Sequence, residues 1–145
     1  MISTDLLKSF LGDTYALMIK THFFHWNVMG PEFPALHSMF EKQYTDLFEA
    51  ADVVAERVRA LGDHPPGGTK TFAQMTSIDD PVLGLDANGI LDVLIQDHKN
   101  MAERAKKGIK VANQANDDVT VDLLIGRVRE HEKQIWMMSS MRKVV

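Results

Sequence analysis

The most restrictive feature of this sequence is a helical repeat of apolar residues in four long segments, which are separated by glycine- and proline-containing breaks. Between residues 4 and 29, Phe10, Leu17 and Phe24 recur every seven residues, which places them on one helix face. Comparable stripes predict three more helices, over residues 34–61, 88–113 and 118–141. No segment alternates as a strand would, and each helix must bury its stripe against the others, so the chain is restricted to an all-α bundle.

The breaks carry residues that begin and end helices. Gly30-Pro31 ends the first helix, because glycine suits the C-terminal turn and proline cannot continue a helix. Gly62 closes the second helix, and Thr4 is the expected N-cap of the first. Residues 63–87 form a long crossover in which residues 71–77 are expected to form a short helical turn. Two helices, a long crossover and two more helices predict a four-helix bundle.

Composition fits one globular domain, residues 1–145, and excludes several classes of protein. The chain is 45% hydrophobic and 25% charged, and it is long enough to bury a core. It has no cysteine, which excludes disulfides and thiolate metal sites. We expect a cytoplasmic protein, because there is neither a signal-type start nor an apolar run long enough to cross a membrane. The net charge of −4 offers no attraction for nucleic acid.

Two pairs of metal-ligating side chains lie on the second predicted helix. His37 and Glu41 are four residues apart, as are Asp52 and Glu56, so each pair shares one face. On a wheel of about 100° per residue centred on Leu47, His37 lies at roughly 80° and Glu56 at roughly 180°, away from the core stripe. The same flank carries Tyr44, Phe48 and Ala55. Such apolar content is unusual for a solvated face and indicates a buried contact between subunits.

These two pairs are too far apart on one helix to hold a single metal ion. His37 and Asp52 are fifteen residues apart, or roughly 22 Å, whereas bonds from metal to ligand are near 2 Å. A second copy, packed antiparallel about a two-fold axis near residues 46 and 47, brings each pair against the complementary pair and makes two identical sites. His25, at the end of the first helix, supplies a further nitrogen. The alternative from spacing alone is a solvated polar face.

Three motifs on the first two helices together resemble the signature of the Dps-type mini-ferritins, the bacterial DNA-protection-during-starvation proteins of the ferritin-like superfamily. The motifs are His25-Trp26-Asn27-Val28-x-Gly30-Pro31-x-Phe33, Leu36-His37-x-x-Phe40-Glu41 and Asp52-x-x-Ala55-Glu56-Arg57. The likeness extends through the four-helix layout and the long crossover. It implies a ferritin-like bundle, a hollow dodecamer built from two-fold dimers, and a ferroxidase centre between subunits.

The resemblance also assigns the site. It implies that one chain contributes His25, His37 and Glu41 and that its two-fold mate contributes Asp52 and Glu56. The resemblance further implies that the metal is iron, that Fe(II) is oxidised, mainly by hydrogen peroxide, and that Fe(III) mineral accumulates inside the shell. The expected function is therefore iron storage and detoxification, although zinc or manganese would suit the same ligands. Trp26, beside the site, is either a radical trap or a packing residue.

The other histidines are weaker candidates for ligands. Di-iron bundles with a site in the bundle core use Glu-x-x-His, which this sequence lacks. His98 and His131 lie on apolar stripes and are expected to be hydrogen-bonded core residues. His22 lies one turn before His25 and is a minor candidate for a ligand.

Three acidic residues, Asp117, Asp118 and Asp122, cluster at the start of the last predicted helix. We expect them to cap this helix and to complement its dipole. The resemblance makes Asp118 and Asp122 candidates for the lining of a pore that admits iron.

DNA binding is expected to be weak or absent. Many members of the family bind DNA through a lysine-rich tail, and almost no residues precede the first predicted helix here. Twelve copies at −4 each give roughly −48, a poor match to a polyanion. Two alternative functions stay open: a nucleoid-associated protein that coats DNA with little catalysis, and a bundle that has kept the cage but lost its activity.

Overall fold

The computed structural model describes residues 3–144, and all of its regular secondary structure is helical. The helices are α1 (Ser3–Asn27), α2 (Phe33–Ala60), α3 (Thr69–Met75), α4 (Ala87–Gln114) and α5 (Asp118–Met141). Each predicted helix is therefore present, with ends that differ by at most two residues, and the short turn in the crossover is α3. Among the described residues none forms a strand, as predicted. Residues 1, 2 and 145 of the predicted domain lie outside the described part.

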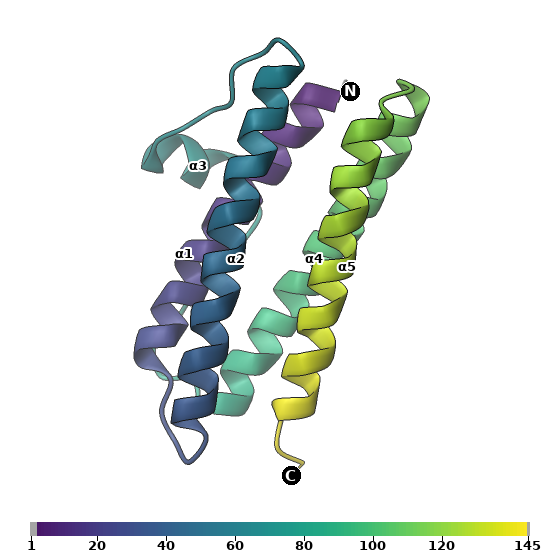
Figure 1. The fold of residues 1–145 in the computed structure, drawn as a ribbon. Helices are drawn as coiled ribbons and strands as arrows, with labels where there is room; N and C mark the ends of the chain where they lie inside the picture. Colours follow the sequence, from purple (N-terminus) through teal and green to yellow (C-terminus); the bar gives the residue numbers. More distant parts are fainter. Residues whose placement is uncertain (1–2, 145) are drawn as a thin grey trace.

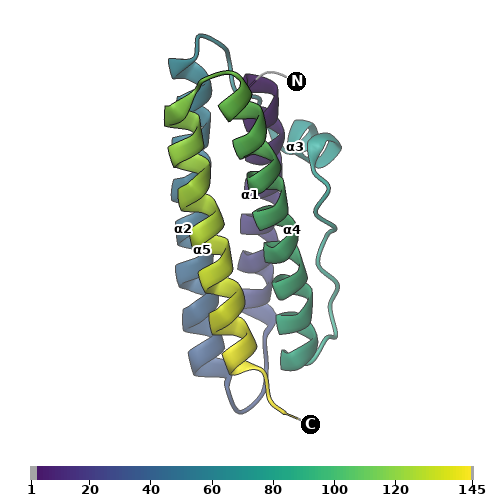
Figure 2. The ribbon, with the colours of Figure 1, turned by 90° about the vertical axis from the view of Figure 1, so that its right-hand side faces the viewer.

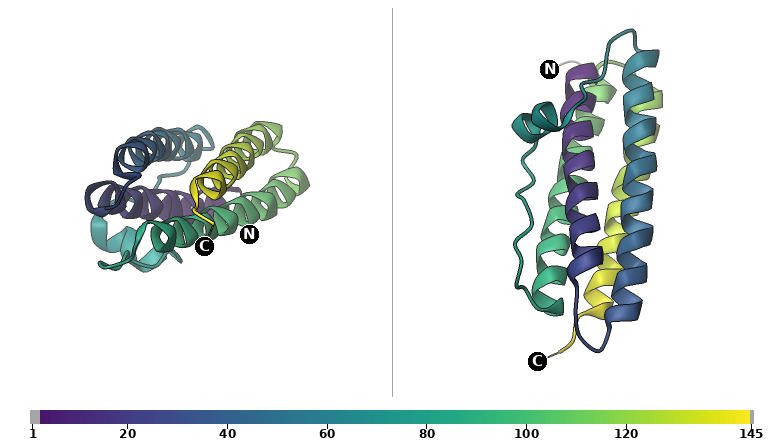
Figure 3. Two further views of the ribbon diagram at one scale, coloured as in Figure 1. Left: turned by 90° about the horizontal axis from the view of Figure 1, so that it is seen from below. Right: turned by 90° about the vertical axis from the view of Figure 1, so that its left-hand side faces the viewer.

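The four long helices form two layers, one of α1 with α4 and the other of α2 with α5, as the end-on view in Figure 3 shows. Helix α1 packs mainly on α2, and α4 packs mainly on α5 (Figure 1). The crossover runs the length of the bundle outside α1 and α4 (Figure 2). Consequently α2 and α4 point in the same direction, which is the connectivity of a ferritin-like bundle.

The predicted apolar stripes form the core between the layers. Phe10, Leu17 and Phe24 of α1 are each at most 2% exposed. The apolar stripe predicted for α2 is buried, apart from Leu61 just after the helix, which is half-buried; its buried members are Leu36, Phe40, Leu47, Val54 and Val58. Because α2 turns this stripe inward, its opposite flank is left on the surface of a single chain.

The ends of the helices follow the sequence signals with one exception. Gly30 and Gly62 have φ of 119° and 91°, a conformation that glycine adopts without steric cost, and each follows the helix that it was predicted to close. The prediction that Thr4 caps α1 is wrong, because the helix already includes Ser3 and the side chain of Thr4 is buried against the bundle. None of the helices within residues 3–144 is long and apolar enough to cross a membrane.

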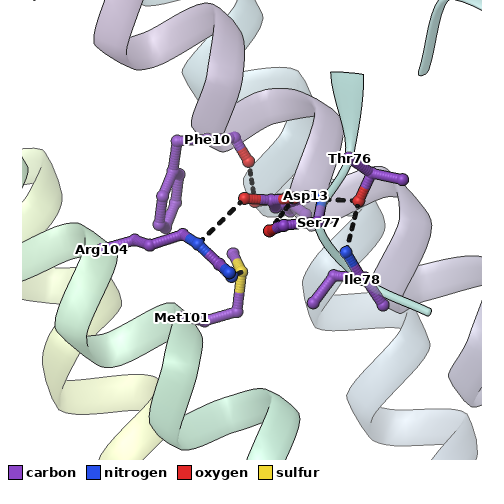
Figure 4. A network of polar contacts seen from close by, with 8 residues as sticks. Phe10, Asp13, Thr76, Ser77, Ile78, Met101 and Arg104 are labelled. Carbon is purple, nitrogen blue, oxygen red and sulfur yellow. Dashed lines mark hydrogen bonds and ion pairs between the residues drawn. The ribbon is translucent and has the colours of Figure 1, made fainter. Parts of the chain in front are cut away.

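A buried carboxylate fixes the crossover to the bundle (Figure 4). Asp13 of α1 is 2% exposed, and its Oδ1 accepts hydrogen bonds from the Thr76 hydroxyl at 2.9 Å and from the backbone N–H of Ser77 at 2.8 Å. Its Oδ2 lies 3.4 Å from the Nε of Arg104 on α4. Since one side chain joins α1, α4 and the residues directly after α3, the position of α3 beside α1 is set by the bundle itself.

Candidate metal centre

Two imidazoles meet at the turn between α1 and α2. The Nδ1 of His25 lies 2.7 Å from the backbone oxygen of His37, and the Nδ1 of His37 lies 2.7 Å from the backbone oxygen of His25. The two rings are stacked, with centroids 3.7 Å apart and planes 12° apart. Gly30-Pro31 makes this exchange possible, because it turns the chain sharply enough to bring the end of one helix beside the start of the next.

These two hydrogen bonds determine where the imidazoles can bind metal. A carbonyl oxygen only accepts, so each Nδ1 must carry the hydrogen and donate it. In a neutral ring the other nitrogen, Nε2, then keeps its lone pair for a metal ion. Metal-binding histidines commonly donate their second N–H to a carbonyl in this way, which fixes the tautomer and the ring orientation. His25 and His37 therefore have the arrangement that metal ligation requires.

Aromatic side chains surround the imidazole pair. The ring of Tyr44 packs edge-on against His25 at 5.2 Å and also contacts His22 at 4.5 Å. His22 in turn lies 4.0 Å from Trp26, measured between ring centroids. Trp26 is nevertheless 62% exposed. His22 thus packs among aromatic rings beside the pair, and its role as a minor ligand stays a prediction, as does radical trapping at Trp26.

The carboxylates predicted as ligands lie on the exposed flank of α2. Glu41 follows His37 by one turn, and Asp52 and Glu56 lie towards the other end of the helix, all exposed in the single chain. A hydrogen bond that the protonated carboxyl of Glu56 donates to Asp52, together with the like charge of Asp52, raises the pKa of Glu56. Two carboxylates close enough to share a proton form a group that a cation would stabilise.

A single chain does not hold the predicted ligands together. Among residues 3–144, no group of three or more histidine, aspartate or glutamate side chains lies close enough to hold a metal ion. The imidazole pair is at the start of α2, and the Asp52–Glu56 pair is beyond its middle. In the single chain the predicted ligands therefore lie in two separate groups.

His98 and His131 lie in the bundle core, as predicted. Their Nδ1 atoms are 2.9 Å apart, and both residues are at most 1% exposed. One ring must donate and the other accept, so this hydrogen bond requires the accepting ring to be unprotonated at Nδ1. Burial, aided by the nearby charge of Arg127, lowers the pKa of His98 to about 3, and burial with the charges of His98 and Arg127 lowers the pKa of His131.

The acidic cluster before α5 has the predicted capping role at Asp117. Its carboxylate accepts from the backbone N–H of Thr120 at 3.1 Å and from Arg57 of α2 at 2.7 Å. Hydrogen bonds from Thr120 and Arg57 outweigh the effect of burial and lower the pKa of Asp117. Asp118 and Asp122 are exposed, and their assignment to a pore stays a prediction.

Sequence reasoning did not foresee the hydrogen bonds that orient the imidazoles. Their acceptors are the backbone oxygens of His25 and His37, and a backbone oxygen carries no sequence signal. The stacking of Phe33 on His37, with ring centroids 4.9 Å apart, was also missed. An available signal was the aromatic residue directly after the Gly30-Pro31 turn, one helical turn before His37.

Comparison with known proteins places this fold and these residues in a family. The ferritin-like domain family matches residues 4–144. DNA protection during starvation protein 2 of Bacillus anthracis is 36% identical over 134 residues, which are 92% of each chain.

Solved structures agree with this placement. Dps from Staphylococcus aureus superposes with a TM-score of 0.95 at 29% identity, over 99% of this chain and 96% of that one. Dps from Vibrio cholerae O1, described as a member of a broad superfamily of ferritin-like diiron-carboxylate proteins, gives a TM-score of 0.91 at 26% identity, over 96% and 87% of the two chains. With its bundle, its long crossover and its histidine- and carboxylate-bearing helices, this chain belongs to the Dps-type mini-ferritins of the ferritin-like family.

Proposed function

We propose that this protein oxidises ferrous iron at centres shared between two copies of the chain and stores the ferric product inside a hollow dodecamer. The observation that carries the proposal is the reciprocal pair of hydrogen bonds between His25 and His37, which leaves both Nε2 atoms available to a metal ion. The nitrogen and carboxylate ligands together suit iron, since ferrous iron accepts imidazole and carboxylate and ferric iron favours hard carboxylate oxygen.

The division of the ligands supports a shared centre. His37 and Glu41 lie at one end of the outer flank of α2, with His25 of α1 beside them, and Asp52 and Glu56 lie towards the other end. An antiparallel partner about a two-fold axis near residues 46 and 47 sets each half against the other. The same operation makes two centres at once, because an isologous contact repeats every interaction.

In this proposal the protein residues bind and orient the iron and leave room for an oxidant. The imidazoles and Glu41 of one copy, with Asp52 and Glu56 of the other, would hold the ferrous ions, while few protein ligands per ion keep positions open. Two ferrous ions give one electron each to hydrogen peroxide, and two protons complete its conversion to two water molecules. Because both electrons are taken up together, hydroxyl radical is not released. The related Vibrio cholerae protein is described as a diiron-carboxylate protein, which supports this use of two ions.

A subunit-mixing experiment tests the shared centre. His37→Ala and Asp52→Ala proteins are each expected to lose rapid oxidation of iron by peroxide, measured as ferric absorbance after anaerobic loading. When the two are dissociated together and reassociated at random, half of the dimers are mixed. Each mixed dimer has one intact centre of two, so activity returns to about one quarter of the unsubstituted level.

The matched control mixes His37→Ala with His25→Ala. Both substitutions damage the imidazole half, so no arrangement of these copies restores an intact centre, and no recovery is expected. Equal recovery in both mixtures, or none in either, contradicts a centre divided between the imidazole and carboxylate halves. Substituted proteins that oxidise iron at the normal rate contradict the assignment of the centre to these residues, and an unsubstituted protein that does not accelerate oxidation contradicts the ferroxidase function itself.

A further inference from the structure

We propose that the exposed indole of Trp26 inserts into a hollow beside Asp52 on a second copy of the chain, and so closes the carboxylate half of the shared centre. This inference rests on the antiparallel pairing in the proposed function and names a contact that the pairing creates. By the symmetry of the dimer, each copy inserts its own Trp26 into the partner and receives the Trp26 of the partner in its own hollow.

The hollow lies where α1, α2 and the crossover meet, and its volume is about 260 Å³. Its walls include Asp52 and mostly apolar side chains, among them Tyr15, Phe48, Ala55, Pro66 and Phe72. Tyr15 and Phe72 stack with ring centroids 4.9 Å apart, and Phe48 is 57% exposed at the rim. The Asp13 network in Figure 4 fixes the end of α3, so the wall that the crossover supplies is held in place.

Trp26 is a large apolar side chain without a matching cover in its own chain. It is 62% exposed, and its ring packs on one side against His22. An indole has one polar atom, which only donates a hydrogen bond, so it suits an apolar hollow that contains a carboxylate acceptor. Asp52 is that acceptor in the wall of the hollow.

The register of the proposed dimer brings the two features together. In an antiparallel pairing about a two-fold axis, the numbers of facing residues always add to the same total. Facing Glu41 with Asp52, or His37 with Glu56, sets this total at 93. Helix α1 runs antiparallel beside α2, and the contacts of His25 with His37 and of His22 with Tyr44 place Trp26 level with residues 37–44 of α2. Residues 37–44 face residues 49–56 of the partner (93 − 44 and 93 − 37), which is the part of α2 that lines the hollow.

Cross-linking tests the contact directly, because the chain has no cysteine of its own. A protein with Trp26→Cys and Ala55→Cys is expected to form covalent dimers with a short bis-maleimide, which spans the space that the indole leaves and is visible as a doubled mass on a denaturing gel. The matched control carries Trp136→Cys with Ala55→Cys. Trp136 is 66% exposed on α5, outside the proposed contact, so this protein is expected to remain uncross-linked.

Fluorescence tests the same contact without cysteines. The chain has two tryptophans, so Trp136→Phe leaves Trp26 as the sole emitter. We expect blue-shifted emission and acrylamide quenching several-fold weaker than for N-acetyltryptophanamide. Adding Ala55→Tyr, which fills the hollow, is expected to restore free quenching, whereas Ala60→Tyr at the end of α2 is not. An indole quenched as freely as the reference compound overturns the proposal.

Iron oxidation measured on the same samples separates the two proposals. Cross-linked, shielded Trp26 in a protein that does not oxidise iron supports the docking contact and contradicts the ferroxidase function. Recovery of oxidation in the subunit-mixing experiment, together with a freely quenched Trp26 and no cross-link, supports the shared centre and overturns the docking contact.

Discussion

The buried pair His98 and His131 predicts that acid destabilises this bundle by an amount that the structure allows us to calculate. The pKa of His98 is about 3 in the folded chain, against an ordinary value of 6.5. A histidine whose pKa is lowered on folding stabilises the fold fully above 6.5, and this contribution is lost as the pH falls from 6.5 towards 3. At pH 5, which is 1.5 units below the ordinary value, 1.36 kcal/mol per unit gives a loss of about 2 kcal/mol from His98.

The pKa of His131 is lowered in the same direction, so this residue adds to the loss. The charged group that acts on both rings is Arg127 of α5, which is paired with Asp46 of α2 at 3.1 Å. From α1 the pair is faced by the ring of Phe10, which cannot accept a proton. Among the hydrogen bonds and ion pairs of the described residues, no carboxylate contacts the pair, so a proton added to either ring is a buried charge without a compensating partner.

The assay compares denaturant unfolding at pH 7.5 and pH 5, followed by circular dichroism at one fixed protein concentration. The double variant His98→Leu/His131→Leu replaces both rings with apolar side chains and is expected to lose about 2 kcal/mol or more of the pH dependence. His64→Leu removes an exposed histidine and serves as the matched control, with the pH dependence unchanged. Equal pH dependence in the unsubstituted protein and the double variant would refute the reasoning.

Four further predictions concern packing, charge and access. The buried carboxylate of Asp97 lies 2.8 Å from the ammonium of Lys20. Lys20→Met leaves this carboxylate without its partner and should lower the free energy of unfolding by about 3–5 kcal/mol. The double variant Lys20→Met/Asp97→Leu removes both charges and should recover most of this loss. Gly108→Ala places a Cβ 2.9 Å from side-chain atoms of the core and should destabilise by about 1–3 kcal/mol, whereas Gly126→Ala meets nothing within 4 Å and should stabilise by about 0.5–1 kcal/mol in the same denaturation assay. Asp122→Asn should slow iron entry in stopped-flow absorbance without changing the native mass; unchanged entry kinetics removes Asp122 from the pore. With a net charge of −4 per chain, a DNA gel shift seen at low salt should disappear by ~150 mM salt, and a shift that persists there contradicts weak DNA binding.

Most of the fold was predictable because helix periodicity and chain breaks are local signals. The spacing of Phe10, Leu17 and Phe24 identified the buried face of α1, and Gly30 and Gly62 marked the ends of two helices. The prediction for Thr4 failed because capping depends on where the chain leaves the bundle, and a threonine near a terminus can equally be buried inside the first turn.

The site was predictable in part. Spacing on α2 placed His37, Glu41, Asp52 and Glu56 on one flank away from the core; in the single chain the three carboxylates are exposed and His37 is half-buried. It could not give the stacking of His25 on His37 or the two carbonyl acceptors, because these depend on the exact path of the turn between two helices. Residue spacing could not predict the hollow beside Asp52 either, because Pro66 and Phe72 line this hollow only through the course of the long crossover.

The two halves of the candidate centre differ in a way that explains why metal binding and pairing of the chains would depend on each other. The imidazole half is already ordered within one chain, because each Nδ1 is fixed by a carbonyl of the other residue. The carboxylate half carries unbalanced negative charge, which raises the pKa of Glu56. If both halves hold the same ions, pairing increases the affinity for metal and metal increases the affinity of pairing by the same factor. Because the carboxylates predicted as ligands lie on the outer flank of α2, the proposed centre is separate from the hydrogen-bonded pair His98 and His131 inside the bundle.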